Sequence, residues 1–310
     1  MLLTGVRVIN FDNSVTAQEE LLRRFSPSMV DLIDLGPSCR LWLNNKNKKR
    51  IIRFLKGKEK HAITFLGSGD FHHISSLLIE QFTQDLSVIV FDCHPDWEGL
   101  PPRLACGAWV SNTLRRNNIK KVVLLGVSSQ DIDGPALRTA ALRYLRDDRV
   151  EIYPYAHAPS SVFLGRVPNN TSLTLKRSLF STMIGWQELK GKDLQGFFGS
   201  LIARLPTKQV YISIDKDCLG ADFSLTNWEE GMLTLDELLD MLVLAKKDLD
   251  IVGVDIVGEY SPVKVKGAIK SIVSRIDHPK NFSALGKSET LVRSVNQRTN
   301  IRILEALRTP

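Results

Sequence analysis

The chain has 310 residues, of which 43% are hydrophobic, enough to bury a sizeable core as one large domain or two small ones. Its formal net charge of +7 is moderate, and its densest basic stretch, 45–53, lacks the interleaved aromatic residues and the motifs of nucleic-acid-binding proteins. The four cysteines form no C-x-x-C pair, no apolar stretch approaches the roughly 20 residues that span a bilayer, and the N-terminus turns polar too early for a signal peptide. We therefore expect a cytoplasmic protein with reduced thiols and with neither nucleic-acid nor membrane partners.

Short apolar runs alternate with helical patterns along the chain. We expect strands at 30–36, 61–67, 86–92, 120–127, 150–155, 209–215 and 249–260, and helices at 48–55, 73–82, 135–145, 194–205, 234–245 and 300–308. This alternation predicts an α/β fold with a mostly parallel sheet and helices on both faces. The segment 156–186 is rich in Ser, Pro and Asn, and fits either a long active-site loop or a small insertion.

Polar side chains follow five of these strands. They are His72 and His73; Asp92, His94 and Asp96; Asp131 and Asp133; Asp215 and Asp217; and Glu259. Parallel strands share one carboxyl edge, which is where open α/β sheets bind their ligands. We therefore expect all five groups on the same rim of the sheet.

The apolar run 88–91 leads directly into Asp92, His94 and Asp96. Residues two apart on an extended chain point the same way, so these three side chains can converge just past the strand. Carboxylates and imidazole together suit a divalent ion such as Mn, Zn or Fe. Taken alone, the motif also fits a solvated turn with exposed acids.

A second pair of acids, Asp215 and Asp217, repeats this spacing at the end of another apolar strand. With one histidine from a third strand end, six ligands become available, enough for two divalent ions with bridging carboxylates. Two ions about 3.5–4 Å apart lower the pKa of a water held between them and yield a hydroxide nucleophile. The combination favours a binuclear metal site over coincidental surface acids.

This combination resembles the ureohydrolase superfamily of arginase, agmatinase and formimidoylglutamase. The family's G-G-D-H turn, D-A-H-x-D strand end and S-x-D-x-D strand end are similar to GDFHH at 69–73, DCHPD at 92–96 and SIDKD at 213–217. The resemblance implies a three-layer α/β/α, arginase-like fold with residues 1–310 as a single domain. It also implies a cofactor of two divalent metal ions, with Mn²⁺ as the expected metal.

The resemblance also implies roles for individual residues. The metal ligands would be His72, Asp92, His94, Asp96, Asp215 and Asp217. Asp96 would in addition serve as general acid and base, and Glu259, in a GEYSP stretch similar to the family's E-V-N-P, would contact the guanidinium of the substrate. The family's first histidine directly follows an aspartate, whereas here Phe71 intervenes after Asp70. An alignment without a gap favours His72, and His73 remains the alternative.

The chain departs from the family in the segments that read the substrate. Cys106 stands where arginases carry a proton-shuttling histidine; it could exchange protons if a neighbour shifted its pKa from about 8.5, or be a small buried residue. The stretch 130–134 keeps Asp133 of the family's R-D-V-D-P-G-E but lacks its arginine and glutamate. Glu229 and Glu230 either line the pocket or face water.

We therefore expect a hydrolase of non-peptide carbon–nitrogen bonds in a small guanidino or amidino compound, acting through a metal-bridging hydroxide. Two alternatives stay open. One is an amide deacetylase-like hydrolase on the same fold, which the His72–His73 tandem suggests, although the full D-x-H-x-D and S-x-D-x-D patterns favour the ureohydrolase interpretation. The other is a metal-binding relative without catalysis, since the proton-shuttling histidine is missing. The chain is also compatible with a homo-oligomer.

Overall fold

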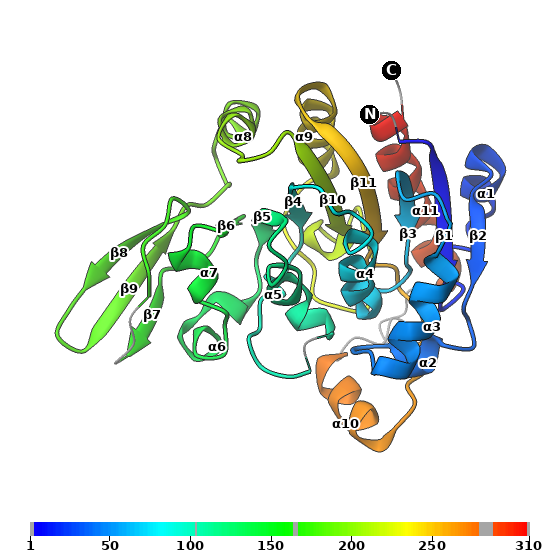
Figure 1. The fold of residues 1–310 in the computed structure, drawn as a ribbon, viewed down its shortest axis with the longest axis horizontal. Coiled ribbons are helices and arrows are strands. Elements are labelled where there is room, and N and C mark those ends of the chain that lie inside the picture. Colours follow the sequence, from blue (N-terminus) through cyan, green and yellow to red (C-terminus); the bar gives the residue numbers. More distant parts are fainter. Residues whose placement is uncertain (1–2, 103, 164–166, 279–287, 309–310) are drawn as a thin grey trace.

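The computed structural model describes residues 3–102, 104–163, 167–278 and 288–308. At its centre lies an eight-stranded sheet in the order β2-β1-β3-β11-β10-β4-β5-β6, in which every adjacent pair is parallel (Figure 1). Its strands are β1 (Gly5–Asn10), β2 (Ser28–Asp31), β3 (Ala62–Phe65), β4 (Leu86–Phe91), β5 (Ile119–Val127), β6 (Val150–Pro154), β10 (Gln209–Asp215) and β11 (Asp250–Val257). The predicted parallel sheet is confirmed.

Two hydrophobic clusters pack against the sheet, one on each face. Alternate residues of β4 enter different clusters: Val88 and Val90 one, Ile89 and Phe91 the other. This explains why the strand is apolar throughout, because a strand covered on both faces has no solvent side. The cluster with Val88 and Val90 includes residues of α2 (Gly36–Cys39), α3 (Asn45–Leu55), α4 (Ser75–Ile79), α5 (Trp109–Thr113), α6 (Gly134–Leu137) and α7 (Arg143–Arg146). The cluster with Ile89 and Phe91 includes residues of α1 (Glu19–Phe25), α8 (Leu194–Ala203), α9 (Leu235–Asp248) and α11 (Glu289–Arg308). Among the described helices, none combines the length and the apolar composition needed to cross a bilayer.

The segment 156–186 forms a second, antiparallel sheet in the order β7-β9-β8. Its strands are β7 (Ser160–Phe163), β8 (Leu173–Arg177) and β9 (Ser181–Trp186). It extends away from the central sheet beyond β6, at the left of Figure 1. Of the two expectations for this segment, the structure shows the insertion.

Some predicted elements differ from the observed ones, and some observed elements were not predicted. The strand expected at 30–36 ends at Asp31, because Gly36 and Pro37 already begin α2. Strand β1 was not predicted, since Arg7 interrupts its apolar run; the buried guanidinium donates to the Thr64 hydroxyl and the Glu59 carbonyl.

The helix expected at 73–82 is a 3₁₀ helix, η1 (Gly69–Ile74), followed by the five-residue α4, and the helix expected at 135–145 is divided into α6 and α7. All six residues of η1 are buried, so no amphipathic period marks it.

The register of the central strands positions the polar rim. Strand β10 lies between β4 and β11, and pairs Ile214 with Phe91 and Asp215 with Val257. Asp92, which follows Phe91, therefore emerges beside Asp215 at the carboxyl edge. The remaining helix, α10 (Ala268–Asp277), lies at the bottom of Figure 1, below this edge of the sheet.

Candidate metal centre

His72 lies among three carboxylates. Its Nδ1 is 3.2 Å from Asp92 Oδ2, 3.3 Å from Asp96 Oδ2 and 3.4 Å from Asp215 Oδ2. Its Nε2 lies 2.9 Å from the Ser213 hydroxyl, which itself donates to a carboxylate of the sheet. Because the serine hydroxyl proton is donated to that carboxylate, Nε2 of His72 must be the donor to Ser213. In the neutral ring, Nδ1 therefore carries the lone pair that faces the acids.

His94 forms a second group around the same aspartate. Its Nδ1 is 3.0 Å from Asp217 Oδ2 and 3.6 Å from Asp92 Oδ1. The possible ligand atoms of Asp92, His94 and Asp217 lie within 4.8 Å of one another, as do those of His72, Asp92 and Asp96. Asp92 belongs to both groups, which is the arrangement that a bridging carboxylate makes.

Local hydrogen bonds hold the two strand ends in place. Asp92 Oδ1 accepts from the His94 backbone N–H at 2.7 Å, and Asp215 Oδ1 accepts from that of Asp217 at 3.1 Å. Asp217 also accepts from the Cys93 backbone N–H at 3.0 Å and so joins the two loops. These turns direct side chains two residues apart toward the same point.

Three of the carboxylates, those of Asp96, Asp215 and Asp217, are crowded enough to resist ionisation. Burial, together with the charge of Asp92, raises the pKa of Asp96 to about 7, and burial with the charges of Asp217 and Asp92 raises the pKa of Asp215 well above its usual range. Burial alone would lower the pKa of His72, but the adjacent carboxylates of Asp92 and Asp96 hold that pKa well above the usual value. The cluster therefore favours added positive charge, from protons or from a cation.

Two buried atoms at the centre make no hydrogen bond within the described part of the chain: His72 Nδ1 and Asp92 Oδ2. Buried polar atoms are normally paired, so these two indicate a missing partner. Imidazole nitrogen and carboxylate oxygen suit Mn, Zn or Fe. The residues present thus fit two divalent ions.

The structure places His73 away from this centre. The ring is fully buried, and burial lowers its pKa to about 3, with the nearby positive charge of Lys270 adding to the effect. His73 belongs to neither group of ligand atoms. Of the two histidines, only His72 faces the acids.

A cavity of about 800 Å³, here called the metal pocket, opens over the ligand groups. Its floor is formed by Asp92, His94, Asp96, Asp215 and Asp217. Its walls include Glu98, Cys106, Asp131, Trp228 and Asp277, together with Leu41, Trp42, Pro101, Pro102, Ile269 and Val273.

The sequence candidates for substrate binding divide between this pocket and its surroundings. Cys106 lines the pocket, and burial, with the charge of Asp96, raises its pKa well above the usual value, so the thiol stays neutral. Asp131 also lines it, whereas Asp133 precedes α6 outside the pocket, with Oδ1 4.0 Å from His157 Nε2.

Glu259 is not brought into the metal pocket; it lines a separate cavity. Its buried carboxylate accepts from Lys216 Nζ and Asn300 Nδ2, both at 2.6 Å, and from Gln18 Nε2 at 3.0 Å. Gly258, and not Glu259, lies beside the metal-ligand groups. Its φ is +84°, and a β-carbon there would lie 2.4 Å from Asp215 Oδ1. The chain turns at Gly258, and the glutamate lies against Lys216.

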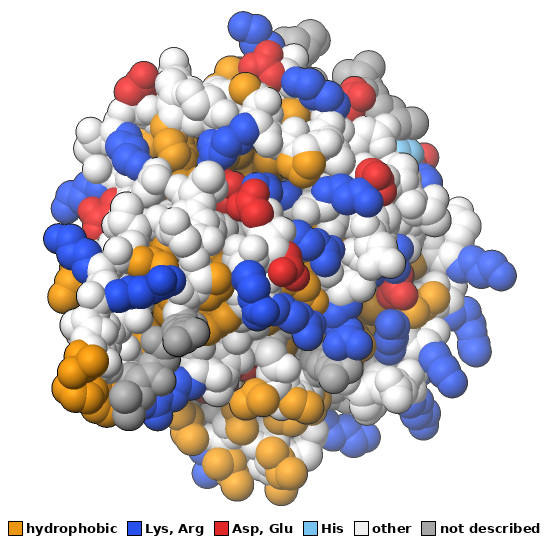
Figure 2. Space-filling view, turned by 60° about the vertical axis from the view of Figure 1, so that its left-hand side comes forward, with side chains coloured by type: hydrophobic (Ala, Val, Ile, Leu, Met, Phe, Trp, Pro, Cys, Tyr) orange, Lys and Arg blue, Asp and Glu red, His pale blue; other side chains and the backbone are white. Residues whose placement is uncertain are grey.

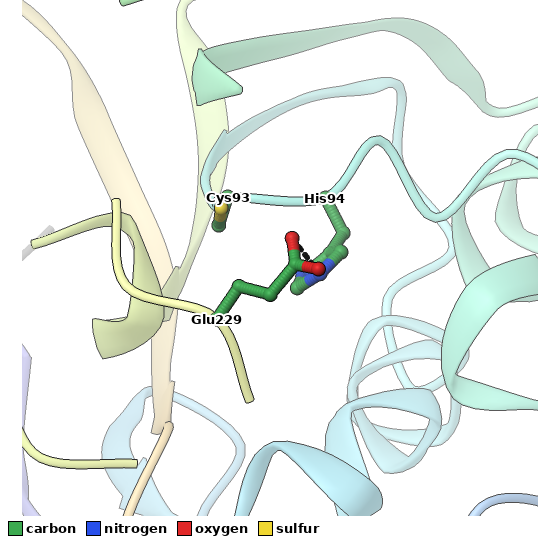
Figure 3. Close-up of side chains that lie close together, drawn as sticks. All are labelled: Cys93, His94 and Glu229. Carbon is green, nitrogen blue, oxygen red and sulfur yellow. Dashed lines mark ion pairs between the residues drawn. The ribbon is translucent and has the colours of Figure 1, made fainter. Parts of the chain in front are cut away.

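The loop before α9 carries two residues beside His94. The Glu229 carboxylate points toward the His94 ring, with Cys93 nearby (Figure 3); Oε2 is 3.9 Å from Nε2, and the glutamate side chain is 65% exposed. Cys93, His94 and Glu229 form a third group of possible ligand atoms, in which burial raises the pKa of the thiol well above its usual value. The Trp228 ring meets that of His94 edge-on at 5.6 Å.

Sequence reasoning did not find the network behind the pocket wall. Asp70 is fully buried and accepts from Arg40, from His278 Nε2 at 2.7 Å and from Trp228 Nε1 at 3.1 Å. His278 follows the last residue of α10, so this carboxylate connects η1 to two walls of the pocket. No local pattern marks these partners.

The fold of this chain is similar to those of known ureohydrolases. It superposes on an arginase from Entamoeba histolytica, solved with L-ornithine, with a TM-score of 0.59 at 11% identity over 100% of this chain and 99% of that one. An agmatine ureohydrolase from Thermoplasma volcanium gives 0.57 at 11% identity over 99% and 90%. A formimidoylglutamase from Bacillus subtilis gives 0.54 at 14% identity over 100% and 88%.

Sequence similarity supports the same relationship. An uncharacterized protein from Thermotoga maritima is 27% identical over 205 residues, which cover 66% of this chain and 60% of that relative's length. Residues 30–274 match the profile of the Arginase family, a stretch that includes all six predicted ligands. The chain therefore belongs to the arginase family, within the ureohydrolase superfamily.

Proposed function

We propose that the chain is a cytoplasmic, manganese-dependent hydrolase of a non-peptide carbon–nitrogen bond in a small guanidino or amidino compound. The observation that carries this proposal is the pair of ligand groups that share Asp92, with unpaired buried atoms at their centre. Membership in the arginase family supports a hydrolase of this class.

The two groups would hold one ion each. His72, Asp92, Asp96 and Asp215 surround the first position, and Asp92, His94 and Asp217 the second. Ions bound there would supply Lewis acidity and lower the pKa of a water molecule toward neutrality.

Asp96 is the proposed general acid and base. Trp109 Nε1 donates to its Oδ2 at 2.7 Å and so fixes the carboxylate at the floor of the pocket. Hydrolysis of a substituted guanidinium adds one water, breaks one C–N bond and yields urea and an ammonium product. Asp96 takes the proton from the water and returns it to the leaving nitrogen.

The pocket wall favours a cationic head group over a neutral amide. Glu98, Asp131 and Asp277 line it in addition to the ligand groups. Burial and the charges of Asp131 and Asp277 raise the pKa of Glu98, so these acids lie close enough to repel one another. A guanidinium or amidinium relieves that repulsion, whereas a neutral amide does not.

The test is an assay of Mn-reconstituted protein against guanidino, amidino and N-acetyl compounds. We expect release of urea or ammonia, and no release by the Asp92→Asn variant. Release of acetate alone would establish the deacetylase-like alternative. Two bound ions without turnover of any compound would indicate the non-catalytic relative.

A further inference from the structure

Six apolar residues line the metal pocket, and they are here called its apolar mouth. Its residues are Leu41, Trp42, Pro101, Pro102, Ile269 and Val273. Helix α10 contributes Ile269, which is 72% exposed, and apolar side chains gather at the bottom of the molecule in Figure 2, where α10 lies in Figure 1. Apolar side chains grouped at a pocket entrance mark a surface that a ligand covers.

This mouth is held in place by polar contacts behind it. Lys270 Nζ donates to the carbonyl oxygens of Ser38, Arg40 and Trp42 at 2.8, 2.6 and 2.6 Å, and lies 4.7 Å from the Trp42 ring centroid. The Trp42 segment in turn pairs with Ala105. Helix α10 and the Trp42 segment are thus joined without a ligand, and a preformed surface binds with a smaller loss of conformational entropy.

The composition of the pocket excludes an anionic second group on the substrate as its main recognition feature. No Lys or Arg occurs among the described residues that line it, so nothing there pairs with a carboxylate. Its volume of about 800 Å³ far exceeds one planar guanidinium, which fills only the floor beside the acids. The remaining space lies at the apolar mouth.

Resting on the proposed function, we propose that the substrate is a guanidine or amidine that carries an alkyl or aryl substituent without an anionic group. The cationic head group lies at the carboxylate floor. The substituent packs on Trp42, Ile269 and Val273, which makes these three residues the specificity determinants.

The test compares guanidines that share one head group: methylguanidine, butylguanidine and 4-guanidinobutanoate. With the Mn-loaded full chain, we expect kcat/KM for butylguanidine to exceed that for methylguanidine by about tenfold or more, because butyl has several more methylene groups and burial of two already supplies that factor. It should also exceed the value for 4-guanidinobutanoate, whose carboxylate meets no Lys or Arg among the described residues that line the pocket. Equal or higher values for either of these two compounds would overturn the proposal.

Two variants on one helix localise the effect. We expect Val273→Ser to lower kcat/KM for butylguanidine about tenfold and that for methylguanidine far less, because a methyl group offers little surface to pack on Val273. Ile272→Ser is the matched control, because Ile272 is 61% exposed and lies outside the pocket; it should change neither value. An equal loss for both substrates in Val273→Ser would contradict the assignment.

Calorimetric binding separates this proposal from the proposed function. We expect benzamidine to bind the Mn-loaded chain at least about tenfold more tightly than acetamidine, and Val273→Ser to remove the difference. If that holds and no guanidine or amidine is hydrolysed, the proposed function fails while the apolar mouth stands. If guanidines are hydrolysed without preference for the butyl group, the mouth assignment alone fails.

Discussion

His72 Nδ1 lies 3.2 Å from Asp92 Oδ2, and neither atom makes a hydrogen bond within the described residues. The two side chains come from different strand ends, η1 after β3 and the turn after β4. Their juxtaposition is the local feature that defines the site, because Asp92 also faces His94 and Asp217. A buried lone pair beside a buried carboxylate oxygen is stable when a cation lies between them.

The two adjacent histidines should behave differently when replaced. We expect His72→Ala to bind one metal ion fewer per chain, because it removes the single nitrogen ligand of the first group. His73→Ala should keep the full metal content and lower the free energy of unfolding by roughly 1–3 kcal/mol, through the cavity it leaves. Elemental analysis and urea unfolding of both variants measure this. Metal loss in His73→Ala with full retention in His72→Ala would reverse the assignment.

Glu259 should act as a structural acid. Its ion pair with Lys216 is buried, so Glu259→Gln leaves an uncompensated ammonium, and we expect a loss of about 3–5 kcal/mol in the free energy of unfolding. The double variant with Lys216→Met should recover much of that loss. Asp34→Asn, which breaks the exposed pair with Arg50, is the matched control and should cost at most about 1 kcal/mol. If Glu259→Gln instead unfolds at the wild-type urea concentration while KM rises, the glutamate contacts substrate.

The metal-free protein should lose stability as pH rises. The pKa of Asp96 is about 7 in the folded protein, against 3.8 for an ordinary aspartate, so between pH 4 and 7 the folded state binds more protons than the unfolded chain. The raised pKa values of His72 and His94 act in the same direction above about pH 6.5.

Urea unfolding at pH 5, 6, 7 and 8 measures this dependence. With Mn²⁺ bound, the free energy of unfolding should decrease less with pH, because the ion replaces the protons. In the metal-free protein, Asp96→Asn should also make this decrease smaller. A metal-free protein that gains stability from pH 5 to pH 8 would show that the carboxylates are not crowded.

Much of the fold and the metal groups could be predicted from local sequence. Apolar runs ending in Asp92, His94 and Asp96, or in Asp215 and Asp217, show both a buried strand and convergent side chains, and both features depend on neighbouring residues only. The choice between His72 and His73 could not be made this way, because it depends on the 3₁₀ winding of η1.

The rest depends on contacts between distant segments. The bond from His278 to Asp70 joins residues 208 positions apart, and nothing near either residue indicates the other. The orientation of Glu259 depends on the single Gly258, whose positive φ turns the chain after β11. The apolar mouth likewise requires α10 to meet the Trp42 segment, a contact made through Lys270.

The metal content of the protein tests the central claim most directly. After reconstitution with Mn²⁺ and removal of free metal, elemental analysis should find two ions per chain in the wild-type protein and none above background in the Asp92→Asn, Asp215→Asn double variant. Asp133→Asn, which changes an acid outside the metal pocket, is the matched control and should retain both ions. A wild-type protein that holds no more manganese than the double variant would contradict a binuclear centre at these strand ends.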